Sequence, residues 1–148
     1  MNSKDNVSVH ASAVMVGDRA VLIRGPSGSG KSRLAFALIV AGRAGQIPAA
    51  TLIGDDRLIL SAKDGGLHAQ GVPELAGMIE IRGIGIRKCD FVAGGTVGLV
   101  VDLDASDAER LPPPKAMKTT ISGLELPRIP VAKGFDPLPL VVGMLTTT

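Results

Sequence analysis

The sequence contains no tryptophan and no tyrosine, and its only aromatic residues are Phe36, Phe91 and Phe135. Proteins that bind single-stranded nucleic acid stack bases on aromatic side chains, so this shortage argues against that class. The formal net charge of +2 is also too small to provide a basic stripe for a nucleic-acid backbone. We therefore expect no nucleic-acid partner.

Cys89 is the only cysteine, which excludes an internal disulfide and fits a reducing cytosol. The N-terminus has no basic stretch followed by an apolar one, so no signal peptide is predicted. No apolar run approaches the roughly 20 residues that cross a bilayer. The sequence therefore predicts a cytoplasmic protein with no membrane partner.

The 148 residues, of which 45% are hydrophobic, suit one compact domain over 1–148, with residues 1–6 expected to be disordered. Apolar and alternating patterns predict strands at Val7–Val16, Ala20–Arg24, Thr51–Gly54, Arg57–Ala62, Leu67–Gln70, Met78–Ile86, Gly98–Asp102, Thr119–Ile121 and Leu124–Val131. Helices are predicted at Lys31–Ala41, ended by Gly42, and from Asp136–Pro137 to about Thr146. The expected fold is α/β, with more strand than helix.

The stretch GPSGSGKS, between an apolar strand and an apolar helix, fits the phosphate-binding pattern G-x-x-x-x-G-K-[ST]. Its glycines let successive N–H groups turn towards phosphates, and the following helix directs the positive end of its dipole at them. Such a loop binds a nucleoside triphosphate with Mg²⁺: the lysine reaches the β- and γ-phosphates and the serine hydroxyl ligates the metal. The loop does not distinguish ATP from GTP. A glycine-rich turn that matches by chance is the alternative. The predicted ligands are Gly25, Pro26, Ser27, Gly28, Ser29, Gly30, Lys31 and Ser32.

His10 lies on the strand before this loop. A two-residue turn at Gly17–Asp18 would pair His10 with Gly25, and a three-residue turn would pair it with Pro26. Either register puts His10 beside the phosphate loop. A partly buried structural histidine is the alternative.

Two apolar strands end in acids, one at Asp55–Asp56 and the other at Asp102 and Asp104. Phosphoryl transfer needs carboxylates to place Mg²⁺ and to accept a proton. The stretch GLVVD, which ends at Asp102, is the better match to the usual pattern. The adjacent charges of Asp55 and Asp56 repel unless a metal or cation lies between them, which favours a site there. Solvated strand ends remain the alternative for both pairs.

A further unusual stretch reads EIRGIG, from Glu80 to Gly85. Strand alternation would place Glu80 and Arg82 on one face. The following Gly-x-Gly lets another group approach the backbone closely. The alternative is an ordinary ion pair on a solvated face.

In this order, SVHASAV, GPSGSGKS, Asp55–Asp56 and MIEIRGIGI resemble the catalytic, C-terminal domain of bacterial HPr kinase/phosphorylase, in the short form found in α-proteobacteria. The resemblance runs from about Ser8 to Pro137. It implies a P-loop, PEP carboxykinase-like domain with a strand-rich mixed sheet and few helices. It also implies ATP-dependent phosphorylation of a serine in an HPr-like phosphocarrier of the phosphotransferase system, reversal by phosphorolysis, and a homo-hexamer.

The resemblance also implies roles for individual residues. Lys31 would bind phosphates, and Ser32 and Glu80 would hold Mg²⁺. Asp56 would be the acid/base. Asp55 and His10 would lie around Asp56 and support it. Arg82 would contribute to both phosphorylation and phosphorolysis. Arg110 would offset the negative charge of the phosphoryl group as it is transferred. Asp102 becomes a structural strand end in this interpretation.

The late loop departs from the family. In the family this loop reads approximately V-R-P-G-R-N and serves dephosphorylation. In this sequence Val131 to Asp136 read VAKGFD, so both arginines are absent. Lys133 offers a point charge without a planar fork. We therefore expect a kinase with weak or no phosphorolysis.

Two alternatives stay open: a small-molecule P-loop kinase, for which an arginine-bearing lid is missing, and a non-catalytic nucleotide-binding module.

Overall fold

The computed structural model describes residues 6–148, so the disorder expected for residues 1–6 falls, except for Asn6, outside the described residues. The strands are β1 (Val7–Val9), β2 (Ser12–Val16), β3 (Arg19–Arg24), β4 (Ala50–Gly54), β5 (Leu58–Lys63), β6 (Gly66–Gly71), β7 (Met78–Ile81), β8 (Gly85–Lys88), β9 (Gly94–Asp102), β10 (Lys118–Ile121) and β11 (Leu124–Pro130). The helices are α1 (Lys31–Arg43) and α2 (Leu138–Thr146), with 3₁₀ turns η2 (Pro73–Leu75) and η3 (Pro114–Met117). Strands thus outnumber helices in an α/β fold, as the sequence predicts.

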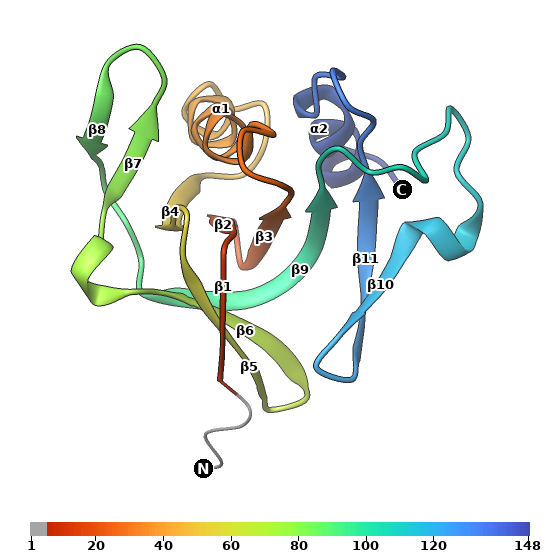
Figure 1. Ribbon diagram of the computed structural model, residues 1–148, viewed down its shortest axis with the longest axis horizontal. Coiled ribbons are helices and arrows are strands. Elements are labelled where there is room, and N and C mark those ends of the chain that lie inside the picture. Colours follow the sequence, from red (N-terminus) through yellow and green to blue (C-terminus); the bar gives the residue numbers. More distant parts are fainter. Residues whose placement is uncertain (1–5) are drawn as a thin grey trace.

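The long strand β9 organises the main sheet, whose order is β1-β5-β6-β9-β3-β2-β4. Its first residues pair antiparallel with β6, and its later residues pair parallel with both β3 and β11. In Figure 1 both helices lie on one side of this sheet, and the separate β7–β8 hairpin stands beside α1. The mixed sheet therefore brings the carboxyl ends of β3, β9 and β11 to one edge.

The main sheet is buried on both faces. On β3, Val21 and Ile23 pack with Leu34 and Leu38 of α1, whereas Leu22 packs on the opposite face. On that opposite face, Leu22 packs with apolar residues of the β5–β6 hairpin, such as Leu58, although this hairpin belongs to the same sheet. Strands buried on both faces read as continuous apolar runs, which explains the sequence AVLI before the phosphate loop.

Several pairs of consecutive strands form hairpins. Ser12 lies opposite Ile23, the register that a two-residue turn after Val16 predicts. The β5–β6 and β10–β11 hairpins turn at Asp64–Gly65 and Ser122–Gly123, where both residues of each pair have positive φ. Positive φ at both positions is typical of the tight turn that matches the twist of paired strands.

Two strand predictions were wrong in extent. Val7–Val16 is not one strand, because β1 pairs with β5 whereas β2 pairs with β3 and β4, and the chain bends at His10 between them. Strand β9 begins at Gly94 rather than Gly98. The added residues include Gly95, where a Cβ would lie 2.5 Å from Met15 Sδ, so close packing requires a glycine at this position of the strand.

The helix boundaries also differ from the prediction. Helix α1 continues through Gly42 to Arg43, because Gly42 faces β4: a Cβ there would lie 2.8 Å from the backbone nitrogen of Ala50. Close packing, not helix termination, explains that glycine. Helix α2 begins at Leu138 with Pro137 at the N-cap position, one residue later than a start at Pro137 predicts. The N–H of Leu138 still donates to Asp136 Oδ1 at 3.1 Å.

Arg82 does not lie on a strand. Strand β7 ends at Ile81, and Arg82 to Ile84 form the turn to β8, with Gly83 at φ 102°. The prediction that Glu80 and Arg82 share one face of a single strand was therefore wrong. Within residues 6–148, no helix is long and apolar enough to cross a membrane.

Candidate active site

The phosphate-binding loop joins β3 to α1, and its glycines are required by its geometry. Gly28 and Gly30 have φ of 82° and 101°, which L side chains rarely adopt. A Cβ on Gly25 would lie 2.5 Å from Ser29 Oγ. The glycines that sequence analysis assigned to phosphate binding therefore allow a compact loop at the N-terminus of α1.

Lys31 folds over this loop. Its Nζ donates to the carbonyl oxygens of Gly25, at 2.8 Å, and Pro26, at 3.1 Å. The ammonium group thereby lies within the loop, next to the positive end of the α1 dipole. A group of this charge in this position suits an anionic ligand.

Asp55 accepts hydrogen bonds from residues of the first helix and of two strands. Only 6% of Asp55 is exposed. Ser32 Oγ lies 2.8 and 2.9 Å from its two carboxylate oxygens, and Ser12 Oγ donates to Oδ1 at 2.7 Å. The N–H of Glu80 donates to Oδ2 at 3.0 Å. Asp55 thus fixes β2, α1 and β7 relative to one another, and its oxygens are already engaged.

Asp56 differs from Asp55 in exposure and backbone conformation. It is exposed, has φ of 70°, and its N–H lies 3.5 Å from Ser12 Oγ. Non-glycine residues with positive φ are uncommon, although aspartate is among those that tolerate it. Within residues 6–148, no side chain or backbone group donates a hydrogen bond to the Asp56 carboxylate, so it is available to a ligand.

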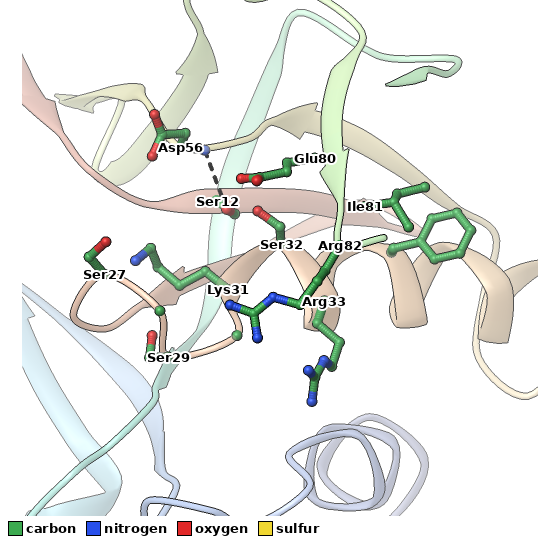
Figure 2. A pocket seen from close by; sticks show the side chains of 13 residues that line it. Ser12, Ser27, Ser29, Lys31, Ser32, Arg33, Asp56, Glu80, Ile81 and Arg82 are labelled. Carbon is green, nitrogen blue, oxygen red and sulfur yellow. Dashed lines mark hydrogen bonds between the residues drawn. The ribbon is translucent and has the colours of Figure 1, made fainter. Parts of the chain in front are cut away.

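These groups converge on a cavity of about 410 Å³ (Figure 2). Its wall includes Lys31 and Ser32 from the loop, Asp56 after β4, and Glu80 and Arg82 from β7 and its turn. The loop also carries the buried Oγ of Ser29, which has no hydrogen-bond partner. Cations, open loop amides and a free hydroxyl fit a phosphate chain.

The same cavity fits Mg²⁺ bound together with phosphates. Ser32 Oγ and the Glu80 carboxylate are oxygen donors of the kind that Mg²⁺ prefers. Among the described residues, no group of three or more His, Cys, Asp and Glu could hold a metal. This agrees with the usual mode of Mg²⁺ binding, in which one or two protein ligands are completed by phosphate oxygens and water.

Two predicted residues lie outside this cavity. His10 is exposed in the bend between β1 and β2, because the ladder with β3 begins at Ser12. Arg110 is exposed in the segment after β9. Neither residue lines the cavity.

Sequence analysis missed Ser12 and Arg33, which do line the cavity. Ser12 is two residues from His10, so strand alternation offered a signal for it. Arg33 follows the phosphate-loop pattern directly, but the pattern itself assigns no function to that position.

Asp102, the better match to the generic pattern, lies away from the cavity in a network of ion pairs. Arg24 Nε donates to Oδ1 at 2.7 Å, and Arg128 Nε donates to Oδ2 at 2.5 Å. Arg128 also binds the carboxylate of Asp107 through both terminal nitrogens. Burial raises the pKa of Asp102, but the bonds and charges of Arg24 and Arg128 outweigh it and leave the pKa below its ordinary value of 3.8.

This network predicts a pH-dependent contribution to stability. Because the pKa of Asp102 is lower in the folded than in the unfolded state, its contribution is full above the unfolded pKa and is lost as the pH falls through the folded one. Asp102→Asn should therefore lower the free energy of unfolding by about 1–2 kcal/mol at about pH 7, and by less at about pH 3. Urea unfolding at both pH values checks this, and an equal loss at both would contradict it.

Comparisons with known proteins agree with this geometry. A solved structure, the Hpr(Ser) kinase/phosphatase from Coxiella burnetii, matches with a TM-score of 0.73 and 28% identity, over 94% of this chain and 93% of that one. This match confirms the P-loop, PEP carboxykinase-like fold that the resemblance implied.

Curated relatives named HPr kinase/phosphorylase match as well. The one from Enterococcus faecalis is 38% identical over 142 residues, covering 86% of this chain and 43% of the relative. The one from Mycoplasma mycoides subsp. mycoides is 42% identical over 77 residues, covering 52% of this chain and 22% of the relative. The chain therefore spans less than half the length of these relatives.

A family model described as the HPr Serine kinase C-terminal domain matches residues 2–141, which is nearly the whole chain. With the fold match, this confirms the resemblance drawn from the motifs. The chain belongs to the HPr serine kinase C-terminal domain family.

Proposed function

We propose that the chain is a protein-serine kinase domain that transfers the γ-phosphoryl group of ATP to a serine of an HPr-like phosphocarrier. Family membership supports the reaction class and the acceptor. The observation that carries the proposal is the convergence of Lys31, Ser32, Asp56 and Glu80 on one cavity. These side chains provide a phosphate-binding cation, two metal ligands and a proton acceptor.

Lys31 and the loop amides would hold the phosphates, and Ser32 and Glu80 would hold Mg²⁺. The metal, when bound, neutralises charge on the phosphate oxygens. Asp55 acts through Ser32: its two oxygens fix the Ser32 hydroxyl at 2.8 and 2.9 Å. Asp55 is therefore a positioning residue in this proposal.

Asp56 would accept the proton of the acceptor serine. Of the two adjacent carboxylates, Asp55 is buried and saturated by donors, whereas Asp56 is exposed at the cavity. A general base must reach the hydroxyl of an incoming protein, which only an exposed carboxylate can do. Arg82 lines the cavity, whereas His10 and Arg110 do not. The roles that the resemblance implies for these three residues, the hexamer and the cytoplasmic location stay predictions.

Phosphorolysis should be weak or absent. The loss of one arginine contact to phosphate should lower the rate of phosphorolysis roughly tenfold to hundredfold. Ala132→Arg should therefore raise phosphate-dependent release of pyrophosphate from a phosphorylated carrier, measured as the ratio of the reverse rate to the forward rate in the same protein. Robust reverse activity in the unmodified protein would contradict this expectation.

Turnover of ATP with and without a purified phosphocarrier tests the proposal against its alternatives. The proposed kinase transfers labelled γ-phosphate to the carrier. A small-molecule kinase would consume ATP with a small acceptor and leave the carrier unlabelled. A binding module would bind ATP without turnover in either case.

A further inference from the structure

We infer that a second cavity, next to the first, binds the ribose and base of the nucleotide whose phosphates occupy the loop. This inference rests on the proposed use of ATP and assigns a site for its nucleoside end. The second cavity has a volume of about 410 Å³, within the range of small-molecule sites. It shares Ser29, Gly30 and Arg33 with the first cavity, so the two meet at the N-terminus of α1.

Sheet topology places this cavity where ligands bind in α/β folds. Strands β3, β9 and β11 run parallel to one another. The cavity is lined by the segments that follow all three: the phosphate loop after β3, Leu103 and Asp104 after β9, and Val131 to Pro137 after β11. In open α/β sheets, ligands bind in the crevice beyond the carboxyl ends of the strands.

Backbone hydrogen bonds hold these three segments together. The N–H of Leu103 donates to the carbonyl of Arg24 at 2.8 Å, and the N–H of Val131 donates to the carbonyl of Asp102 at 2.9 Å. The N–H of Ala105 donates to the carbonyl of Val131 at 2.9 Å. The base of the cavity is thus a continuation of the sheet, which suits a preformed site.

The distribution of charge separates the two cavities. The cations Lys31, Arg33 and Arg82 outnumber the carboxylates Asp56 and Glu80 in the first cavity, which suits phosphates. In the second cavity the carboxylates Asp104 and Asp136 outnumber the one cation, Arg33, and they accept hydrogen bonds from ribose hydroxyls or an exocyclic amino group. A ligand with one anionic end and one neutral, donor-bearing end matches the pair.

Arg33 connects the two cavities. It follows Lys31 and Ser32 directly, and in Figure 2 its side chain points away from Asp56 and Glu80, towards the side of α2. In a nucleotide that occupies both cavities, the phosphate nearest the ribose would therefore lie beside Arg33.

Phe135 provides the aromatic surface for the base. It lines the second cavity, and 70% of it is exposed, so its ring is open to a ligand. Bases stack on such rings whatever their identity. Phe135 and Ala132 occupy the positions where the resembling family's loop has arginines, so the late loop here offers apolar groups in place of cations.

Calorimetric titration with ATP and with inorganic tripolyphosphate, both in Mg²⁺, tests this assignment. The intact protein should bind ATP more tightly than tripolyphosphate. Phe135→Ala should weaken ATP binding about fivefold to tenfold and leave tripolyphosphate binding unchanged. Ala132→Leu, which fills the cavity, should weaken ATP binding at least as much. The control, Leu111→Ala, removes a side chain that is 75% exposed and lines neither cavity, and should change neither affinity.

Equal weakening of both ligands by Phe135→Ala, or no weakening of ATP by either cavity variant, would overturn the inference. Failure to bind ATP at all would overturn both this inference and the proposed function. Selective loss of ATP affinity, in a protein that transfers no phosphate to any phosphocarrier, would sustain the inference and overturn the proposed function.

Discussion

Asp56→Asn should lower the rate of phosphoryl transfer to the phosphocarrier about 10²- to 10⁴-fold and leave ATP binding close to its original strength. The variant removes the only exposed carboxylate of the adjacent pair and keeps its size. Asparagine also tolerates the positive φ of 70° at this position. Transfer of labelled phosphate under single-turnover conditions, beside calorimetric titration with ATP, measures the two effects separately.

Asp102→Asn is the matched control for this change, because Asp102 ends the strand with the better generic pattern. Its carboxylate is engaged by Arg24 and Arg128 and lies outside the cavity. At a temperature where both variants are folded, it should transfer phosphate at close to the original rate. Loss of transfer in Asp102→Asn with retention in Asp56→Asn would show that the catalytic acid had been assigned to the wrong strand.

Asp55→Ala should have the largest effect on stability, lowering the free energy of unfolding by about 2–4 kcal/mol. The substitution leaves the buried hydroxyl of Ser12, the half-buried hydroxyl of Ser32 and the N–H of Glu80 without their acceptor. It also releases Ser32, so phosphoryl transfer should fall even where the variant stays folded. Urea unfolding, with the slope checked for change, measures the loss of stability.

Asp56→Asn serves as the control for Asp55→Ala too. The Asp56 side chain is exposed, so its replacement should change the free energy of unfolding by no more than about 0.5 kcal/mol. Similar losses for the two variants would mean that the Asp55 hydrogen bonds contribute nothing particular to the fold.

Features set by neighbouring residues were predictable from the sequence. The phosphate loop depends on glycines and Lys-Ser within one short stretch, and the structure builds it between β3 and α1 as expected. The hydrogen bond from Leu138 to Asp136 at the start of α2 and the tight turns at Asp64–Gly65 and Ser122–Gly123 are also local. Each follows from the conformational preferences of a few adjacent residues.

Features set by distant contacts were not predictable. Gly42 resembles a helix end, but it is a glycine because another strand packs against it, and Gly95 is a glycine because a methionine packs against it. The bend at His10 depends on β1 having a different partner from β2. Such contacts join segments that the sequence alone does not place together.

The candidate site shows the same division. The motifs contain Asp55 and Asp56, but only the fold shows that one is saturated and the other is open. Likewise, the second cavity arises from three strand ends that meet through the order of the sheet. Sequence analysis found these strands separately and had no basis for joining the loops that follow them.

The most direct test of the central claim is to identify the phosphorylated residue after incubation of this protein, ATP and Mg²⁺ with an HPr-like phosphocarrier. We expect a single phosphoserine by mass spectrometry, stable to acid, and no labelling of a carrier whose acceptor serine is replaced by alanine. An unmodified carrier, in the presence of a protein that binds ATP and is fully folded, would overturn the proposed kinase function.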